Sequence, residues 1–206
     1  MLRRVSAILS AFLLILPAAA AAHVYNCSVN DPTGDTNDSP GLGFRGQPFQ
    51  DIVRTSIIRT DTTLAFSMDV AAPLPEAATM KNPHGLLLWM WGMNTGSTFP
   101  LGYPIAKGNA GLLEFWVHLM WDGTGWGAQV IDRRPTVTGG DPVVTAVPYT
   151  ISGATITITA PAALFDDPDH FRWGSTTWTW SAHLGTDGAH SVDRAPDDHV
   201  TDCTAS

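Results

Sequence analysis

The sequence lacks the short motifs that mark the common catalytic centres. It contains no G-x-S-x-G, no H-E-x-x-H and no G-x-x-x-x-G-K, which would indicate a serine nucleophile, a zinc ion or a nucleotide phosphate. It has only two glutamates, Glu76 and Glu114, and its aspartates gather near the chain ends instead of suggesting an opposed acid pair. We therefore expect no nucleotide and no catalytic activity. A polysaccharide-acting enzyme is the least favoured function.

Basic residues and long apolar runs are also scarce. Lys and Arg number 11 against 19 Asp and Glu, a formal net charge of −8, which disfavours nucleic acid and anionic lipid as partners. No later run approaches the ~18 uninterrupted apolar residues of a membrane-spanning helix. Residues 1–22 combine a basic start, a short apolar run and small residues, which predicts a secretory signal peptide. We expect a secreted protein with one domain over 23–206 and no membrane insertion after cleavage.

Cysteine occurs only twice, as Cys27 and Cys203. Two cysteines in an exported chain more often pair than stay free, so we expect a disulfide between the ends of the domain. This bond would bring together acidic residues that lie near the two cysteines, namely Asp31, Asp35, Asp193, Asp197 and Asp198. Their mutual repulsion favours a cation, and hard oxygen ligands suit Ca²⁺. The alternative is that these acids belong to solvated turns.

Short β-branched or alternating runs recur along the chain, and no helix of normal length is predicted. Strands are expected at 52–59, 64–70, 85–91, 112–121, 126–133, 143–149, 154–160 and 171–184. At most one short helical turn is expected, between Pro161 and Phe165, with proline at its first position. The acidic stretch 187–203 has almost nothing suited to a core. The pattern predicts an all-β fold, an antiparallel two-sheet β-sandwich of the jelly-roll type.

Eight tryptophans raise the possibility of sugar binding, because exposed indole rings stack on the apolar faces of sugars. The alternative is core filling, which is favoured for tryptophans spaced two apart in apolar strands. Trp121 and Trp126 flank a glycine-rich hairpin tip and are expected to be harder to bury. The strand before them should point Phe115, Val117 and Leu119 inward. Its outward residues complete the expected carbohydrate-binding surface, which comprises Glu114, Trp116, His118, Trp121 and Trp126.

Several segments, taken in order, carry a resemblance to a known family. They are D-P-T-G-D at 31–35, D-I-V at 51–53, T-L-A-F-S-M at 63–68, N-T-G at 94–96, I-S-G-A-T-I-T-I at 151–158 and D-R-A-P-D at 193–197. In this order they resemble exported β-sandwich domains related to family 9 carbohydrate-binding modules and the DOMON group. The resemblance implies a two-sheet antiparallel sandwich that frequently binds calcium, with some members binding sugars and some haem. W-M-W-G-M at 89–93 stands where relatives often carry an aspartate-rich segment.

Haem is not expected, because the spacing of His118, Met68, Met90 and Met93 specifies no pair of axial ligands. The favoured function is a secreted non-catalytic module that binds carbohydrate and carries a structural calcium ion. Its expected partner is an extracellular or cell-wall polysaccharide. The alternative is an exported structural or interaction domain with no small-molecule ligand.

Overall fold

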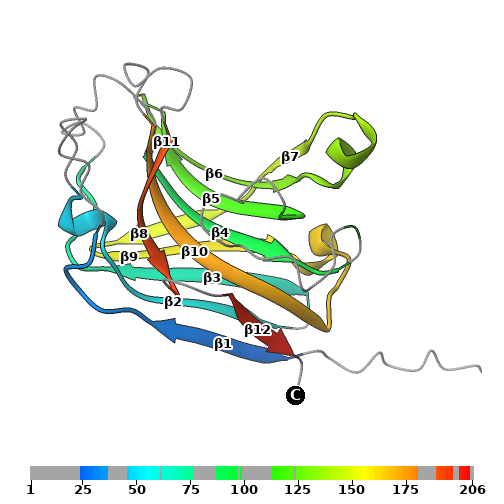
Figure 1. The fold of residues 1–206 in the computed structure, drawn as a ribbon, viewed down its shortest axis with the longest axis horizontal. Helices are drawn as coiled ribbons and strands as arrows, with labels where there is room; N and C mark the ends of the chain where they lie inside the picture. The colour runs from blue at the N-terminus through cyan, green and yellow to red at the C-terminus, as the bar shows by residue number, and fades with distance from the viewer. Residues whose placement is uncertain are drawn as a thin grey trace, which may run out of the picture.

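The computed structural model describes residues 24–36, 46–60, 62–76, 87–96, 98, 113–122, 124–180, 189–196 and 200–204. The expected signal peptide lies outside these ranges. Within them, two antiparallel sheets pack face to face, which confirms the predicted all-β sandwich (Figure 1). No helix in the described ranges is long and apolar enough to cross a membrane.

One sheet has five strands in the order β1-β2-β3-β9-β8. Their bounds are β1 Tyr25–Asn30, β2 Ile52–Arg59, β3 Thr63–Val70, β9 Thr155–Pro161 and β8 Tyr149–Ser152. Strands β2 and β3 form the predicted hairpin, with Ile57 opposite Phe66. Strand β9 then pairs with β3, so a strand from late in the chain completes this sheet.

The other sheet has seven strands, six of them in the order β11-β10-β4-β5-β6-β7. Their bounds are β11 Ala189–Ala195, β10 His170–Trp180, β4 Leu87–Asn94, β5 Phe115–Trp121, β6 Trp126–Asp132 and β7 Val143–Ala146. The seventh strand, β12 Thr201–Thr204, pairs with the first part of β10, and β11 pairs with the rest of it. The last two strands of the chain therefore share one edge of this sheet.

The core lies between the sheets and is rich in aromatic side chains. In β3, Leu64, Phe66 and Met68 are fully buried and alternate with half-buried residues, as predicted. The Phe66 ring lies 6.0 Å from the Trp91 ring of the opposite sheet. The indole N–H of Trp91 donates to Thr55 Oγ1 at 2.8 Å, so this tryptophan is buried with its polar atom satisfied.

Within the described ranges, three short 3-10 turns lie between the strands. Ala162–Phe165 is the turn expected after Pro161, and Pro48–Gln50 and Arg134–Thr138 add two that the sequence pattern did not reveal. The single strand expected at 143–149 is divided into β7 and β8, which belong to different sheets. The division falls at Pro148, whose nitrogen has no hydrogen to donate to a sheet.

The acidic stretch 187–203 departs most from expectation, because it contains β11 and β12. Val192, Ala195 and Cys203 are buried in these strands, although the stretch was expected to contribute almost nothing to a core. Polar residues on either side of these three obscure the alternation of buried and exposed positions in the sequence.

A disulfide between Cys27 on β1 and Cys203 on β12 joins the two sheets, as predicted from the cysteine count. The Cα atoms lie 5.9 Å apart, and the cysteines are 176 residues apart in sequence. The bond therefore connects the first and last described strands (Figure 1).

Removal of this bond tests its contribution to stability. Closing a loop of this length lowers the entropy of the unfolded chain, so Cys27→Ser/Cys203→Ser should lose about 5 kcal/mol of unfolding free energy. Urea unfolding of the variant and of the oxidised native protein measures the difference. Reductant should lower the native protein to the variant's stability and leave the variant unchanged. Equal stability of the variant and the oxidised native protein would contradict the expectation.

Candidate metal centre

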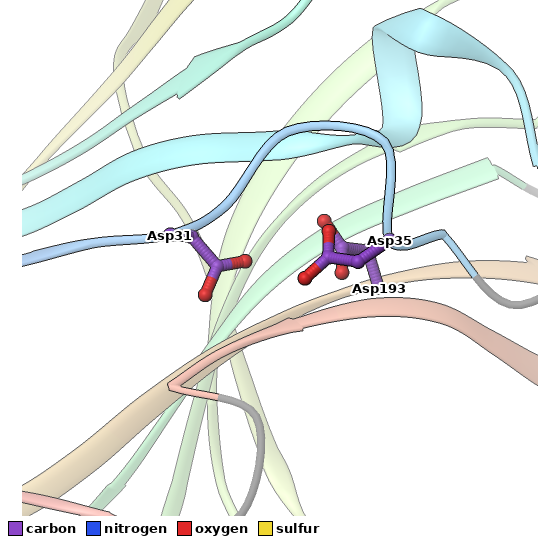
Figure 2. Close-up of side chains that lie close together, drawn as sticks. All are labelled: Asp31, Asp35 and Asp193. Carbon is purple, nitrogen blue, oxygen red and sulfur yellow. The ribbon is translucent and has the colours of Figure 1, made fainter.

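Three aspartates from opposite ends of the chain meet beside the sheet edge. Asp31 and Asp35 lie in the loop that follows β1, and Asp193 lies on β11. One carboxylate oxygen from each lies within 4.8 Å of the others. Figure 2 shows the Asp31 carboxylate turned towards the other two. The cluster contains three of the five acids predicted to share a cation; Asp197 and Asp198 lie outside the described residues.

Backbone contacts hold the 31–35 loop against the start of β2. The N–H of Asp31 donates to the carbonyl of Val53 at 2.9 Å. The N–H of Gly34 donates to Asp51 Oδ2 at 2.8 Å. Gly34 has φ of +86°, a left-handed conformation that glycine adopts without steric cost, so the loop can turn back at this point. The loop thus places Asp31 and Asp35 on the same side of the sandwich.

Asp193 is held in place by two backbone donors and is only 1% exposed. Its Oδ2 accepts from the N–H of Ile52 at 2.5 Å, and its Oδ1 accepts from the N–H of Arg194 at 2.8 Å. The pKa of Asp193 is raised to about 7, mainly by burial and further by the negative charges of Asp35 and Asp51. The two N–H groups oppose the rise. The carboxylate is therefore held in a position where burial makes its ionised form unfavourable.

Asp51 is a further acid next to this cluster, because its charge acts on Asp193 and its side chain accepts from Gly34. It is 6% exposed and directly precedes β2. Its Oδ2 accepts from Gly34, but its buried Oδ1 accepts no hydrogen bond, and neither does the buried Oδ1 of Asp35. Buried carboxylate oxygens without donors are uncommon and suggest a missing ligand. The only sequence signal was the position of Asp51 within the D-I-V segment.

The donor set suits a hard divalent cation. All the available atoms are carboxylate oxygens, which Ca²⁺ prefers and binds at about 2.3–2.6 Å. Two oxygens on one such ion lie no more than about 5 Å apart, which the cluster's 4.8 Å limit satisfies. Neither histidine nor cysteine contributes to the cluster, so the donors do not resemble a zinc site. These residues therefore fit the calcium ion that the sequence predicted.

No family model, curated protein or solved structure matches this chain.

The residues expected to form a carbohydrate-binding surface lie on or next to β5 and on β6. Inward and outward residues alternate along β5 as predicted, but the outward residues are less exposed than expected. Phe115, Val117 and Leu119 are fully buried in the core, which confirms the inward set. Trp116 is half-buried on the opposite face, where the Arg133 guanidinium lies 4.1 Å from its ring centroid. One face of this indole is therefore covered by a cation instead of being open to a sugar.

Glu114 was expected to be exposed, and this expectation is wrong. The side chain is 0% exposed and accepts hydrogen bonds from Thr95 N at 2.6 Å, from Thr95 Oγ1 at 2.5 Å and from Thr98 N. Three donors from the segment after β4 surround the carboxylate. Glu114 therefore holds this segment in place and has little capacity left for a ligand.

His118 was also expected to be exposed and is instead 5% exposed. Burial lowers its pKa to about 4, so the ring is neutral at physiological pH. Its Nε2 lies 2.7 Å from Gln129 Nε2 on β6, and with the amide as donor the ring nitrogen accepts. This histidine serves as a hydrogen-bonded packing residue between two strands.

The hairpin tryptophans pack together instead of forming an open pair. Trp121 is only 3% exposed and belongs to the core, which contradicts the expectation that it resists burial. Trp126 is partly buried, with its ring 5.3 Å from that of Trp121 and 5.4 Å from that of Trp89. Of the five residues proposed for sugar binding, only Trp116 and Trp126 retain partial exposure.

The raised pKa of Asp193 predicts how stability depends on pH when calcium is removed. Its folded pKa of about 7 lies above the reference value of 3.8, so this carboxyl binds a proton on folding. Its favourable contribution is complete below about pH 4 and is lost as the pH rises through about 7. His118 acts oppositely, because its folded pKa lies below its ordinary value and its contribution grows as the pH rises from about 4 to 6.5.

The difference between native protein and Asp193→Asn separates these two effects. In a chelator, urea unfolding should show the native protein losing stability relative to the variant between about pH 4 and pH 7. Saturating calcium should remove this relative loss, because the ion favours the charged carboxylate. Parallel stability curves in the chelator would contradict the assigned environment of Asp193.

Proposed function

We propose that this protein is an exported, non-catalytic β-sandwich module that binds one calcium ion where its chain ends meet. The observation that carries the proposal is the cluster of Asp31, Asp35 and Asp193 around a common point, with buried oxygens of Asp35 and Asp51 lacking donors. A divalent cation would satisfy these oxygens and offset their repulsion at the same time.

The ion would act as a structural connector. Its ligands come from the loop after β1 and from β11, and the hydrogen bond from Gly34 to Asp51 ties this loop to the residue before β2. These segments are separated along the chain but joined nearby by the Cys27–Cys203 disulfide. A bound cation would therefore secure the same junction as the covalent bond, and without it the carboxylates would push the segments apart.

Export is supported by the disulfide, because such bonds persist mainly in oxidising compartments. Calcium sites of extracellular modules commonly have dissociation constants of about 10⁻⁴–10⁻³ M, which a small carboxylate cluster with additional backbone or water ligands can provide. The two-sheet sandwich and the acidic junction also agree with what the resemblance to family 9 carbohydrate-binding modules and DOMON-like domains implies.

Sugar binding is not part of the proposed function. Stacking requires accessible indole faces, but Arg133 covers Trp116 on one side and Trp121 is in the core. Glu114 and His118, which were expected to supply polar contacts, are buried and hydrogen-bonded. The geometry therefore favours a structural or interaction module over a polysaccharide receptor.

Calcium binding can be measured by calorimetric titration and thermal unfolding of chelator-treated protein. Calcium at 100 times its dissociation constant should raise the unfolding free energy by about 2.7 kcal/mol. Asp35→Asn should abolish this rise without lowering stability in the chelator, because it removes a ligand and also a repelling charge. Magnesium should stabilise the native protein less, since it demands a tighter octahedral site.

Asp141→Asn is the matched control, because Asp141 is an exposed aspartate outside the cluster. This variant should keep the full calcium response. A native protein whose melting temperature is indifferent to both chelator and millimolar calcium would overturn the proposal, and so would an unchanged response in Asp35→Asn.

A further inference from the structure

The two lateral edges of the sandwich are built differently. At one edge, the Cys27–Cys203 disulfide ties β1 of the five-stranded sheet to β12 of the seven-stranded sheet. At the other edge, β7 pairs only with β6 and β8 only with β9 among the described strands. Figure 1 shows the short turn at 134–138, which precedes β7, on the side away from β1 and β12. Strand β7 therefore ends its sheet with an unpaired side.

The hydrogen-bond pattern shows which groups of β7 are available at this open side. The N–H of Val147 donates to the carbonyl of Ala128 on β6 at 3.0 Å. Backbone groups in an antiparallel strand point alternately towards each neighbour. Val143 and Thr145 therefore face β6, whereas the N–H and C=O groups of Val144 and Ala146 point outward.

The side chains around this edge are apolar and nearly uncharged. Val137, Val143 and Val144 are 54%, 55% and 53% exposed. From residue 135 to residue 165 the only charged residue is Asp141, although the chain as a whole has a net charge of −8. Natural edge strands usually carry charges that prevent pairing with another chain. Between residues 135 and 165 this edge carries only Asp141, so its own charges oppose the approach of a second copy only weakly.

We propose that β7 pairs antiparallel with β7 of a second copy of this chain, forming a two-fold symmetric dimer with a continuous sheet across it. The outward groups set the register: Val144 of one copy lies opposite Ala146 of the other, and Thr145 lies on the two-fold axis. Each Val144–Ala146 pair then exchanges both its N–H and C=O groups. The same strand supplies both halves of the contact, as a two-fold interface requires.

The prolines on either side of β7 limit this pairing to one register and to a short ladder of hydrogen bonds. Pro142 and Pro148 have no N–H, so a strand shifted towards either one loses a hydrogen bond. A partner strand therefore cannot extend the ladder far beyond 143–147. So short a contact buries less surface than a standard stable interface, and we expect a dimer that dissociates on dilution.

Sedimentation velocity over a concentration series tests the dimer with the mature, oxidised protein in calcium. The weight-average mass should rise from that of one chain towards twice that value as the concentration increases. Raising sodium chloride from about 0.05 to about 0.5 M should strengthen dimerisation, because salt screens the repulsion between two acidic chains.

Two substitutions at one position test the interface. Val144→Lys places like charges next to the symmetry axis and should weaken dimerisation by about tenfold or more. Val144→Pro removes an outward N–H that the fold does not use and should have the same effect without adding charge. Val24→Lys is the matched control, since Val24 is 52% exposed on the far edge, and it should leave dimerisation unchanged. Thermal unfolding must show that all three variants remain folded.

Three outcomes would overturn the proposal. A native protein that stays monomeric up to about 0.5 mM lacks a dimer of even the weak class expected for a small interface. A dimer that both Val144 variants preserve uses a different surface. Oligomers that grow beyond two copies show that the edge pairs without two-fold closure.

Discussion

The covalent bond between Cys27 and Cys203 opposes the repulsion between acidic segments at the two ends of the domain. The disulfide holds β1 next to β12, and hydrogen bonds of Asp31 and Asp193 to the start of β2 keep the acidic segments close together. Burial, and to a smaller extent the charges of Asp35 and Asp51, raise the pKa of Asp193 to about 7. Hydrogen bonds from Ile52 and Arg194 oppose this rise, but buried oxygens of Asp35 and Asp51 accept no hydrogen bond. The proposed calcium ion would complete this junction, which would then depend on both a covalent and an ionic link.

The face that was expected to bind sugar shows how a β-strand can present polar residues without exposing them. Alternation separates Trp116 and His118 on β5, and Glu114 just before it, from the core residues of this strand. Each member nevertheless has its own internal contact: Thr95 with Glu114, Arg133 with Trp116 and Gln129 with His118. A buried polar side chain is tolerated when it is hydrogen-bonded, so this face is stabilised by its polar residues. The seven-stranded sheet is consequently held together on both faces.

Prediction from sequence succeeded where one physical rule dominated. The β3 residues alternate because one face of the strand is buried, and the resulting period of two is visible without any structure. Prediction failed where contacts between distant segments allow polar residues to be buried. Strand β11 contains Asp193, a buried acid that accepts a hydrogen bond from Ile52, 141 residues away in the sequence. The position of Trp121 beside a glycine-rich turn favours exposure, but its side chain packs against Trp126 and the core. Asp51 was missed because its role depends on the position of Gly34.

The sequence by itself determined the all-β class, the pairing of two cysteines and the acidic character of the segments next to them. These properties follow from periodicity, composition and chain order, which are local or can be counted directly. Only the tertiary structure decided which carboxylates meet, which strand edge stays open and which tryptophans are accessible. Each of these depends on distances between segments far apart in the chain, and sheet order sets those distances. The order β1-β2-β3-β9-β8 shows this, because β9 pairs with β3, a strand that lies about 90 residues earlier in the sequence.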